Sequence, residues 1–484
     1  MRDSLFHVER LEATTLQAQI REMLVSAVLA GHLPSGTPIP STRAMAKRLK
    51  VSRNTVISAY QALADDGYLV PRDRSGFYVA DGLTRGPAPE SPVEMAEGRI
   101  DWASRLRHRP TGQANIVKPS NWQDCPYPFI YGQVDQALFP VTAWRDCMRQ
   151  AMSRKWLDAW TEDRFTADDP MLVEQIRQRI LTRRGVLAGP DEVLITLGAQ
   201  NALHLLTSLL VKPGAPFAIE DPGYPDVRNM VALQGGEVRP TPVDGEGLDV
   251  GRLPPAGLVF VTPSHQFPTN VTMSLDRRRA LLAWAEANDA LVIEDDYEFE
   301  TNYAGEPTPA LKSLDRTGRV LYVGSLSKSL MPGIRLGFIV ADTALIAEAR
   351  AYRRLMLRHP PGNNQRVVAL FLALGHHDAL VARLHKTYAS RERVMRESLE
   401  AHLPGWSRSP GFGGTSFWVE GPKALDSNAL AERALAEGIV IEPGDIYYAG
   451  EPRRNTFRLG FSSIAEERIA PGIDKLAGLA KGMV

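Results

Sequence analysis

Residues 320–335 read VLYVGSLSKSLMPGIR, and this stretch decides the fold of the larger part of the 484-residue chain. The apolar run 320–324 predicts a buried β-strand, and the polar loop after it holds one lysine, Lys328. Ser325 and Ser327 lie three and one residues before this lysine, and Arg335 lies seven residues after it. Lysine can form a Schiff base, and arginine can donate two hydrogen bonds to one phosphate. A serine-rich loop with a lysine is more often simply solvated, so its surroundings decide its role.

Apolar runs of the same kind occur along the chain and alternate with helical patterns. Strands are predicted at 193–196, 217–220, 258–262, 291–294 and 320–324, with helices such as 201–211 and 276–288 between them. Such alternation predicts an α/β domain around a mostly parallel sheet. We expect this domain to span residues 117–484 and to bind ligands at the carboxyl ends of its strands.

Several residues suited to binding a ligand follow these predicted strands or lie in an apolar run near the C-terminus. They are Gly198, Ala199 and Gln200 at a strand-to-helix junction, Tyr224 in a loop, Asp295 and Tyr297 after the strand 291–294, and Arg458 in the run 457–461. Each has an ordinary alternative. A junction glycine is often just a tight turn, a loop tyrosine is often half-buried packing, an acidic strand end is often a solvated turn or a metal site, and a strand arginine is often an edge charge.

Taken together, these residues match the demands of pyridoxal phosphate. This cofactor needs a lysine for a Schiff base, a carboxylate beside its ring nitrogen, an aromatic plane and a phosphate site. We expect Lys328 to form the Schiff base, Asp295 to hold the ring nitrogen and Tyr297 to contact the ring hydroxyl. Tyr224 would stack on the ring.

The phosphate of that cofactor would bind a helix N-terminus together with the lysine loop. Backbone N–H groups at a helix N-terminus form a ready anion site. The predicted phosphate residues are Gly198, Ala199, Gln200, Ser325, Ser327 and Arg335. Arg458, flanked by apolar side chains, is predicted to hold the carboxylate of an effector.

Residues 1–80 carry a separate pattern, which predicts an α+β winged helix-turn-helix. An apolar stripe runs through the first helix, and the next two helices can begin at Ser41 and Ser52. We expect Ala44, Met45 and Leu49 to face inward from the second helix. Strands at 68–71 and 77–79, joined by a turn at 72–76, would form the wing.

The charge of this segment favours DNA as its partner. Residues 41–64 hold five basic residues and no acidic one, although the whole chain has a formal net charge of zero. A local basic excess is what contact with phosphates requires. The alternative is a helical domain with a solvated basic face. We expect Arg53 and Asn54 to contact base edges in the major groove, and Arg43, Ser52, Thr55 and the backbone at Gly76 to contact phosphates.

Between the two domains, residues 81–116 lose periodicity and contain several prolines and glycines, which predicts a semi-stiff linker. The two cysteines, Cys125 and Cys147, are too few for a disulfide framework or a metal site, so no metal is expected. No signal peptide and no membrane span are predicted, which favours a cytoplasmic protein that does not bind membranes.

Two resemblances fit these patterns. The run LPSGTPIPSTRAMAKRLKVSRNTVISAYQALADDGYL (33–69), closed by RSGFYVA (74–80), resembles the winged helix of GntR-type regulators. Residues 125–484 resemble the fold-type I aminotransferases in the order of their cofactor residues. A fusion of the two is similar to the MocR family, the GabR-like regulators, and the phrase TPSHQFP (262–268) is close to that family's version of the loop. This resemblance implies pyridoxal phosphate, double-stranded DNA and a homodimer.

The sequence departs from these relatives at three places. Phe267 stands where true aminotransferases usually have an asparagine that binds the ring hydroxyl, and this favours a regulator over an enzyme. Asn270 stands where the family usually has glycine, so the following turn is expected to differ. The segment 163–172, DRFTADDPML, has no glycine where the family has a motif that reaches the cofactor phosphate of the partner subunit. It can instead shape an effector pocket.

The resulting hypothesis is a sensor. An amine or amino-acid effector would displace Lys328 from its aldimine with the cofactor and change the affinity for DNA, with at most a slow transamination half-reaction. One alternative is an active class I/II aminotransferase with a DNA-binding arm. Another is a regulator whose large domain has lost the cofactor and serves as a dimerisation scaffold. The effector, the operator and the direction of regulation stay open.

Overall fold

The computed structural model describes residue 6 and residues 14–73, 75–83, 100–302, 308–409 and 413–483. The chain divides into two compact units, Met1–Leu106 and Arg107–Val484. The expected linker, 81–116, lies across this division, and its residues 84–99 fall outside the described residues. Of the remainder, Trp102–Arg105 form a short helix, α4, and Pro110–Gly112 form one turn of 3₁₀-helix.

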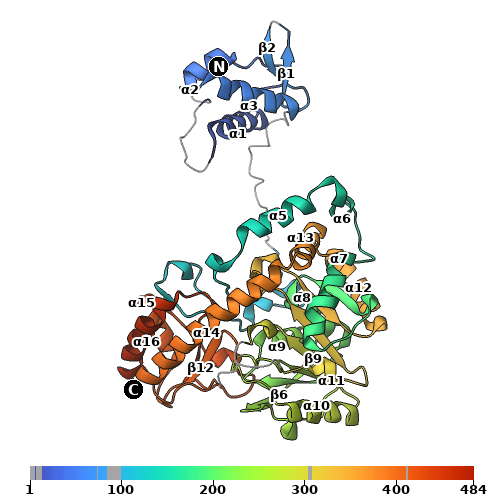
Figure 1. Ribbon diagram of the computed structural model, residues 1–484, viewed down its shortest axis with the longest axis vertical. Helices are drawn as coiled ribbons and strands as arrows, with labels where there is room; N and C mark the ends of the chain where they lie inside the picture. Colours follow the sequence, from blue (N-terminus) through green and yellow to red (C-terminus); the bar gives the residue numbers. More distant parts are fainter. Residues whose placement is uncertain are drawn as a thin grey trace. The chain divides into compact units, whose positions relative to one another are not determined.

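The N-terminal unit is a three-helix winged fold (Figure 1). Its elements are α1 (Leu16–Leu29), α2 (Thr42–Leu49), α3 (Arg53–Asp65), β1 (Leu69–Arg72) and β2 (Gly76–Val79). Ser41 and Ser52 cap α2 and α3, because the hydroxyl of each accepts a hydrogen bond from the backbone N–H three residues later. The antiparallel pair β1–β2 forms the wing; Arg74, in the predicted turn between them, lies outside the described residues.

One expectation for α2 was wrong. Met45 is fully buried as predicted, but Ala44 is exposed and Ala46 is buried instead. In a helix of 3.6 residues per turn, positions i, i+1 and i+4 share one side, whereas position i−1 points away from it. Met45, Ala46 and the half-buried Leu49 therefore share the side that faces the core, and Ala44 faces solvent.

The larger unit is built on an eight-stranded mixed sheet with the order β4-β11-β10-β9-β8-β5-β6-β7. The strands are β4 (Val193–Thr196), β5 (Pro216–Asp221), β6 (Glu237–Asp244), β7 (Gly247–Leu248), β8 (Leu258–Val261), β9 (Leu291–Asp296), β10 (Val320–Ser325) and β11 (Gly337–Val340). All five predicted strands are present within two residues. Strand β11, which sequence analysis did not predict, runs antiparallel between β4 and β10 and returns the chain after the lysine loop.

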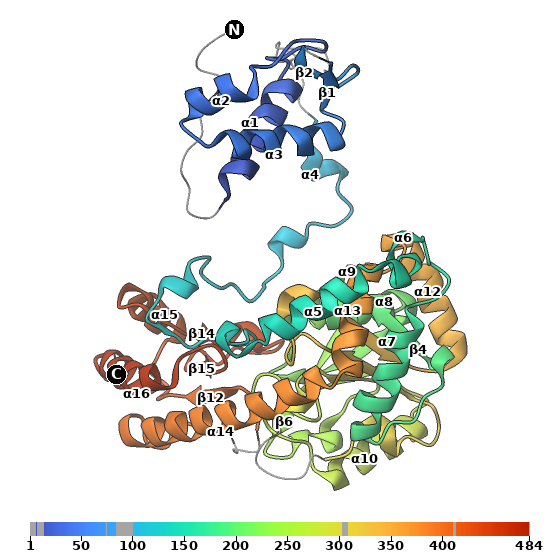
Figure 2. The ribbon, with the colours of Figure 1, turned by 45° about the horizontal axis from the view of Figure 1, so that its top comes forward.

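Helices cover both faces of this sheet (Figures 1 and 2). They are α5 (Val141–Ala151), α7 (Pro170–Gln175), α8 (Gly198–Leu210), α9 (Pro225–Leu233), α10 (Leu275–Ala287), α12 (Thr343–Leu357) and α13 (Gly362–Ala373). Alternate residues of β10 point to opposite faces of the sheet. Leu321 and Val323 pack in a cluster with residues of α8, α9 and α12, whereas Tyr322 packs in a cluster with residues of α7 and α13. The sheet is buried on both sides, which explains its nearly continuous apolar strands.

A smaller C-terminal sheet lies beside the long helix α14 (His376–His402). Its strands are β12 (Ser416–Glu420), β15 (Thr456–Gly460) and β14 (Glu442–Pro443), and the helices α15 (Ser427–Ala436) and α16 (Glu466–Lys481) accompany it. Helix α14 packs against both α13 and α16, so it ties the two sheets together (Figure 2). In the described part of the chain, no single helix has the length and apolarity of a membrane span, although the bent pair α13–α14 meets those criteria by length and composition alone.

Candidate functional site

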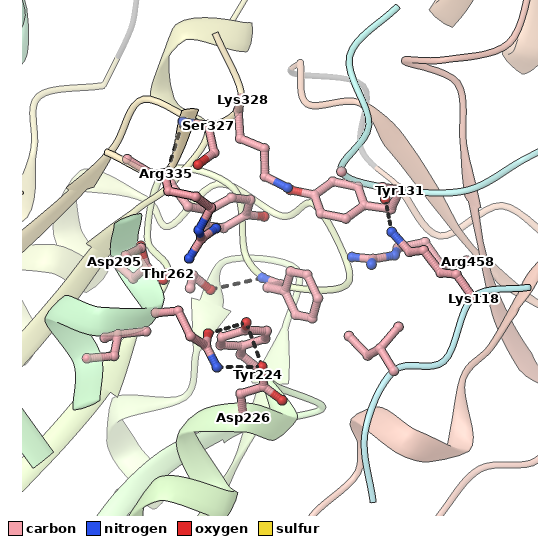
Figure 3. A pocket seen from close by; sticks show the side chains of 18 residues that line it. Lys118, Tyr131, Tyr224, Asp226, Thr262, Asp295, Ser327, Lys328, Arg335 and Arg458 are labelled. Atoms are coloured by element: carbon pink, nitrogen blue, oxygen red, sulfur yellow. Dashed lines mark hydrogen bonds between the residues drawn. The ribbon is translucent and has the colours of Figure 1, made fainter. Parts of the chain in front are cut away.

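A cavity of about 310 Å³ opens beside the carboxyl ends of β9 and β10 and the first turn of α8 (Figure 3). It brings together ten of the eleven residues that sequence analysis assigned to the cofactor and the effector. These are Ala199, Gln200, Tyr224, Asp295, Tyr297, Ser325, Ser327, Lys328, Arg335 and Arg458. The eleventh, Gly198, lies against the Arg335 guanidinium, because a Cβ built at Gly198 would be 3.1 Å from Nη2 of that arginine.

Lys328 extends from the loop after β10 into this cavity. Its Nζ lies 4.3 Å from the centroid of the Tyr131 ring. Burial lowers the pKa of Lys328 to about 8, although Glu298 acts in the opposite direction. Gly132, with a φ of +79°, leaves the space that this amine uses: a Cβ there would lie 2.7 Å from Nζ. A lysine with a lowered pKa is uncharged more often near neutral pH, as a nucleophilic amine requires.

Asp295 is the penultimate residue of β9 and is 5% exposed. Its Oδ1 is buried and has no hydrogen-bond partner among the described residues. Burial, together with the charge of Asp296, raises the pKa of Asp295 to about 8. A buried carboxylate oxygen without a donor is costly unless a ligand supplies one. A protonated ring nitrogen would be such a donor, so this residue fits pyridoxal phosphate.

The lysine loop and the start of α8 form a concave group of anion donors. The first N–H groups of α8 have no partner within the helix. Arg335, in a left-handed conformation with φ 54°, donates from Nη2 to the carbonyl of Leu197 at 3.0 Å. Ser327 N donates to Ser325 Oγ at 3.2 Å. Close packing of Gly337 on the backbone of Gly198 keeps the two segments adjacent. This donor set fits a phosphate.

Tyr224 belongs to a polar triad at the start of α9. Its hydroxyl donates toward Gln200 Oε1 at 2.8 Å and Asp226 Oδ2 at 3.0 Å, and Gln200 Nε2 donates to the same Asp226 oxygen at 2.8 Å. Sequence analysis missed Asp226, although its place in the first turn of a helix after Tyr224-Pro225 was a usable signal. The triad fixes the Tyr224 ring on one wall of the cavity (Figure 3).

Phe267 and Tyr297 form an aromatic wall. The Phe267 ring meets Tyr131, Tyr224 and Tyr297 edge to face, with centroids 5.8, 5.1 and 5.9 Å apart. The hydroxyl of Tyr297 donates to the backbone carbonyl of His265 at 2.9 Å. The position at which aminotransferases usually have an asparagine is therefore filled here by an apolar ring, which offers no side-chain hydrogen bond.

Arg458, predicted to meet an effector carboxylate, already has a carboxylate partner. Its Nε and Nη2 lie 2.9 and 2.8 Å from Glu442 Oε2, and both side chains are almost fully buried. The guanidinium also lies 3.9 Å from the centroid of the Tyr131 ring and 4.3 Å from that of Phe267. Arg458 still lines the cavity. Sequence analysis missed Glu442, because 16 residues separate the pair and only the β14–β15 pairing brings them together.

The two other departures from the resembling families have structural accounts. Asn270 adopts a φ of +68°, which asparagine tolerates as glycine does, and its Nδ2 donates to the carbonyl of Gly413 at 2.7 Å. In the segment 163–172, Asp168 pairs with Arg350 and Arg353 and Asp169 pairs with Arg366. Residues 163–172 do not line the cavity around Lys328, whereas Phe165 and Thr166 line a separate hollow, so a role of this segment in an effector pocket stays a prediction.

In the N-terminal unit, the residues expected to contact DNA lie around the start of α3 and on the wing. Arg43, Ser52, Arg53, Asn54 and Gly76 are exposed, and Thr55 is half-buried. Ser52 also has a structural role as the cap of α3, where its hydroxyl lies 2.8 Å from that of Thr55. Arg53 Nε donates to Thr42 Oγ1 at 3.4 Å, a long contact that leaves the remaining guanidinium N–H groups for other partners.

Comparison with known proteins matches each unit to a family. Residues 16–79 match the gntR family of bacterial regulatory proteins, and residues 144–476 match the class I and II aminotransferases. The chain is 45% identical to the HTH-type transcriptional regulator TauR of Rhodobacter capsulatus over 96% of both chains. It is 31% identical to the probable rhizopine catabolism regulatory protein MocR of Rhizobium meliloti, over 95% of this chain and 93% of that one.

Among solved structures, the larger unit is similar to LysN, the α-aminoadipate aminotransferase of Thermus thermophilus, complexed with N-(5'-phosphopyridoxyl)-L-leucine. The identity is 27% and the TM-score 0.70, over 79% of this chain and 99% of that one. The match confirms the predicted fold-type I architecture. The protein thus belongs to the MocR/GabR-type transcription regulators, in which a GntR winged helix precedes a class I and II aminotransferase domain.

Proposed function

We propose that the larger unit holds pyridoxal phosphate on Lys328, that the amine of an effector would displace Lys328 from the cofactor, and that this exchange changes how tightly the winged helix binds DNA. One observation carries the proposal: Asp295, near the end of β9, and Lys328, after the neighbouring parallel strand β10, line one cavity, and a buried oxygen of Asp295 has no donor among the described residues. A lysine and an unpaired carboxylate facing one cavity are the two groups that this cofactor cannot do without.

Each remaining part of the cofactor has matching residues on this chain. When bound, pyridoxal phosphate supplies an aldehyde carbon that reacts with primary amines and a ring that withdraws electrons. Asp295 would keep a proton on the ring nitrogen, and Tyr224 would cover one face of the ring. Arg335, Ser325, Ser327 and the N–H groups at Gly198, Ala199 and Gln200 would hold the phosphate.

Regulation suits this site better than rapid turnover. Transamination needs Lys328 to move a proton at the α carbon of the substrate, with the ring held in one orientation. Phe267 offers no hydrogen bond to the ring, and the charge of Arg458 is already shared with Glu442. We infer that the amine stays bound as a signal. The alternative function, an active aminotransferase, would require sustained production of keto acid.

We further propose that the protein acts as a homodimer in the cytoplasm. Val141, Met148 and Met152, at the start of α5, within it and just after it, are about half exposed, and Leu355 and Met356 at the end of α12 are exposed as well. Exposed apolar side chains gathered on helices are typical of protein interfaces. A dimer would present two winged helices to a repeated or palindromic operator.

The visible absorbance spectrum of the purified protein tests the proposal. We expect a long-wavelength band with pyridoxal phosphate that is absent from Lys328→Ala, and a stable change of that band with one class of amine and no accumulating keto acid. Lys312→Ala, a lysine outside the cavity, is the matched control and should keep the band. If the wild-type protein shows no band with added cofactor, the proposal is wrong. Sustained keto-acid formation would favour the aminotransferase.

A further inference from the structure

A second lysine, Lys118, reaches the cavity from the segment that follows the expected linker. Its Nζ donates to the carbonyl of Tyr131 and lies 3.5 Å from Glu442 Oε1. A Cβ built at Gly132 would lie 3.8 Å from this Nζ and 2.7 Å from that of Lys328, so the two amines approach the same glycine. Figure 3 shows Lys118 beside Arg458, on the side of Tyr131 away from Asp295. No sequence motif indicated this residue.

Glu442 is the shared partner of Lys118 and Arg458. Its Oε1 accepts from the backbone N–H of Tyr131 at 3.2 Å and faces Lys118, while Oε2 meets Arg458 and the hydroxyl of Tyr447. Burial raises the pKa of Glu442, but Arg458 and Lys118 outweigh this effect and hold it below the usual value. Glu442 is therefore ionised, and it is one carboxylate between two cations.

Lys118 and Arg458 place two basic side chains at one end of the cavity, with Glu442 as their shared carboxylate. Glu298, a buried acid near Tyr131, accepts hydrogen bonds from Tyr131 and Thr415, and burial raises its pKa. Lys118 is 26% exposed, and burial lowers its pKa, as does Arg458. A partly desolvated cation gains from a further anion, and the cavity lies open to both Lys118 and Arg458. The acidic group of a ligand would supply that anion.

The segment that carries Lys118 is also fixed to the cofactor side of the cavity. Gln113 Nε2 donates to the carbonyl of Asn229 at 3.1 Å, and Asn229 Nδ2 donates to Ala114 O and Asn115 Oδ1. Asn229 lies on α9, the helix that begins directly after Tyr224. Residues 113–118 therefore contact both walls of the cavity, and the chain continues from them toward the DNA-binding unit.

We propose that Lys118 is a specificity residue that recognises the acidic end of the effector together with Arg458. Glu442 is the internal counter-ion of both basic side chains, and the acid of the effector would share these two partners with it. The acid is a carboxylate or a sulfonate. Because Lys118 stands at the end of the linker, its change of partner alters the anchorage of residues 113–118. This inference rests on the proposed function, since the amine of the same ligand would take the place of Lys328 on the cofactor.

Paired ligands test this inference with the intact, cofactor-loaded protein. The change in the visible band is titrated with β-alanine, 4-aminobutyrate and taurine, and with propylamine and butylamine, which carry no acid. In Lys118→Met we expect apparent affinity for at least one acidic amine to fall tenfold or more, with no change for the acid-free amines. Lys118→Arg should keep most of the preference for acidic over acid-free amines. Comparing the affinities for the two carboxylates with that for taurine shows whether the site prefers a carboxylate or a sulfonate.

Two outcomes would overturn the role of Lys118. One is an equal loss for acidic and acid-free amines in Lys118→Met, which indicates a purely structural ion pair. The other is a wild-type band that forms normally but shows no preference for acidic amines. Absence of the band from the wild-type protein would instead refute the cofactor proposal, so the two failures are distinguishable. Hydrogen exchange of residues 113–118, measured with and without the preferred ligand, should change in the wild-type protein and not in Lys118→Met.

Discussion

At the scale of single residues, burial controls the chemistry of the site. Burial disfavours the charged form of both groups, so it lowers the pKa of Lys328 to about 8 and raises the pKa of Asp295 to about 8. The two groups are therefore poised near neutral pH. A ligand that brings a donor to Asp295 and an electrophilic carbon to Lys328 would satisfy both.

Replacing Asp295 by asparagine tests this view. We expect cofactor affinity to fall roughly 10- to 100-fold, because a hydrogen bond to a charged group contributes about 1.5–3 kcal/mol. The dissociation constant is measured by titrating the visible band. Asp276→Asn, an exposed acid on α10, is the control and should bind normally. Unchanged affinity in Asp295→Asn would show that the carboxylate does not contact the cofactor.

The pH dependence of cofactor attachment follows from the pKa of Lys328. In the cofactor-free protein, only the uncharged amine reacts, so the attachment rate should rise between pH 7 and 8 and level off above about pH 9, given a pKa of about 8. Stopped-flow absorbance measures this rate. A rate that keeps rising through pH 10 would mean that the lysine has its ordinary pKa and that burial does not control it.

Sequence analysis selected cavity residues that lie in recognisable local motifs. It missed cavity residues whose position depends on contacts between distant parts of the chain. Lys328, Asp295 and Arg335 carry motifs in their immediate neighbourhood. Lys118 and Glu442 do not, because more than 300 residues separate them and their contact requires the small C-terminal sheet to lie against the start of the larger unit. Single-residue chemistry was thus predictable, and the internal counter-ion was not.

At the scale of elements, the strands followed from their apolar runs, while their order did not. The five predicted strands are all buried on both faces, so their composition was sufficient. Strand β11 has only four residues and follows the lysine loop directly, and its antiparallel insertion depends on close packing between Gly337 and Gly198. No local pattern encodes such a contact.

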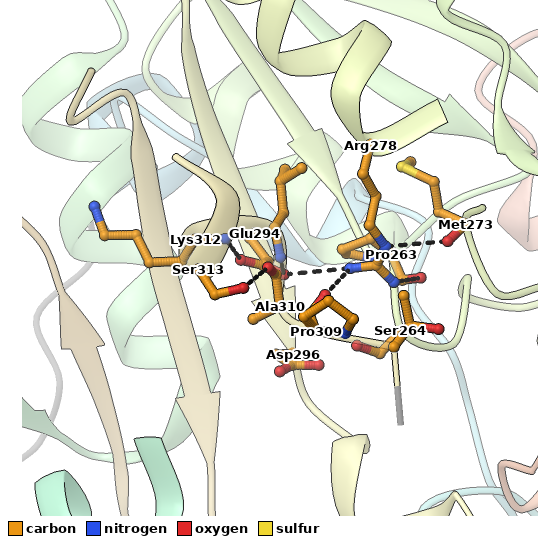
Figure 4. Close-up of polar contacts among 12 residues, drawn as sticks. Pro263, Ser264, Met273, Arg278, Glu294, Asp296, Pro309, Ala310, Lys312 and Ser313 are labelled. Atoms are coloured by element: carbon orange, nitrogen blue, oxygen red, sulfur yellow. Dashed lines mark hydrogen bonds and ion pairs between the residues drawn. The ribbon is translucent and has the colours of Figure 1, made fainter. Parts of the chain in front are cut away.

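A buried polar network also supports β9 around Glu294 (Figure 4). Arg278, which is fully buried on α10, donates to the carbonyls of Met273, Pro263 and Pro309, and its Nη1 lies 4.0 Å from Glu294 Oε1. Glu294 in turn accepts from the backbone N–H groups of residues 311 and 312. The network joins α10, β9 and two loops, and Asp295 is the next residue on β9.

Arg278→Met should destabilise the larger unit by about 3–5 kcal/mol, because it leaves buried acceptors and an acid without their partner. Thermal or urea unfolding of the full chain measures this loss. Arg279→Met, at the neighbouring exposed position, should change stability by less than about 0.5 kcal/mol. We expect Glu294→Gln to restore part of the loss in the double variant. Equal effects of the two arginine variants would contradict the role of the network.

At the scale of the whole molecule, the neutral net charge hides two distinct electrostatic environments. The N-terminal unit carries the basic run 41–64, whereas the larger unit pairs many of its arginines with internal acids such as Asp168, Asp169 and Asp296. The overall composition could not reveal this division, but the local sequence did. The proposed link between the units is the chain segment that precedes Lys118. A ligand can change DNA affinity through this segment only if the ligand binds the DNA-binding and non-binding states of the protein with different affinities.

The most direct test is the affinity for DNA with and without effector. The duplex is one selected by the wild-type protein from a random library, and the effector is the amine that changes the visible band. Fluorescence anisotropy at fixed salt should show a change in dissociation constant of about fivefold or more for the wild-type protein and none for Lys328→Ala, which should still bind the duplex. An equal response of Lys328→Ala, or no response of the wild-type protein, would contradict the account.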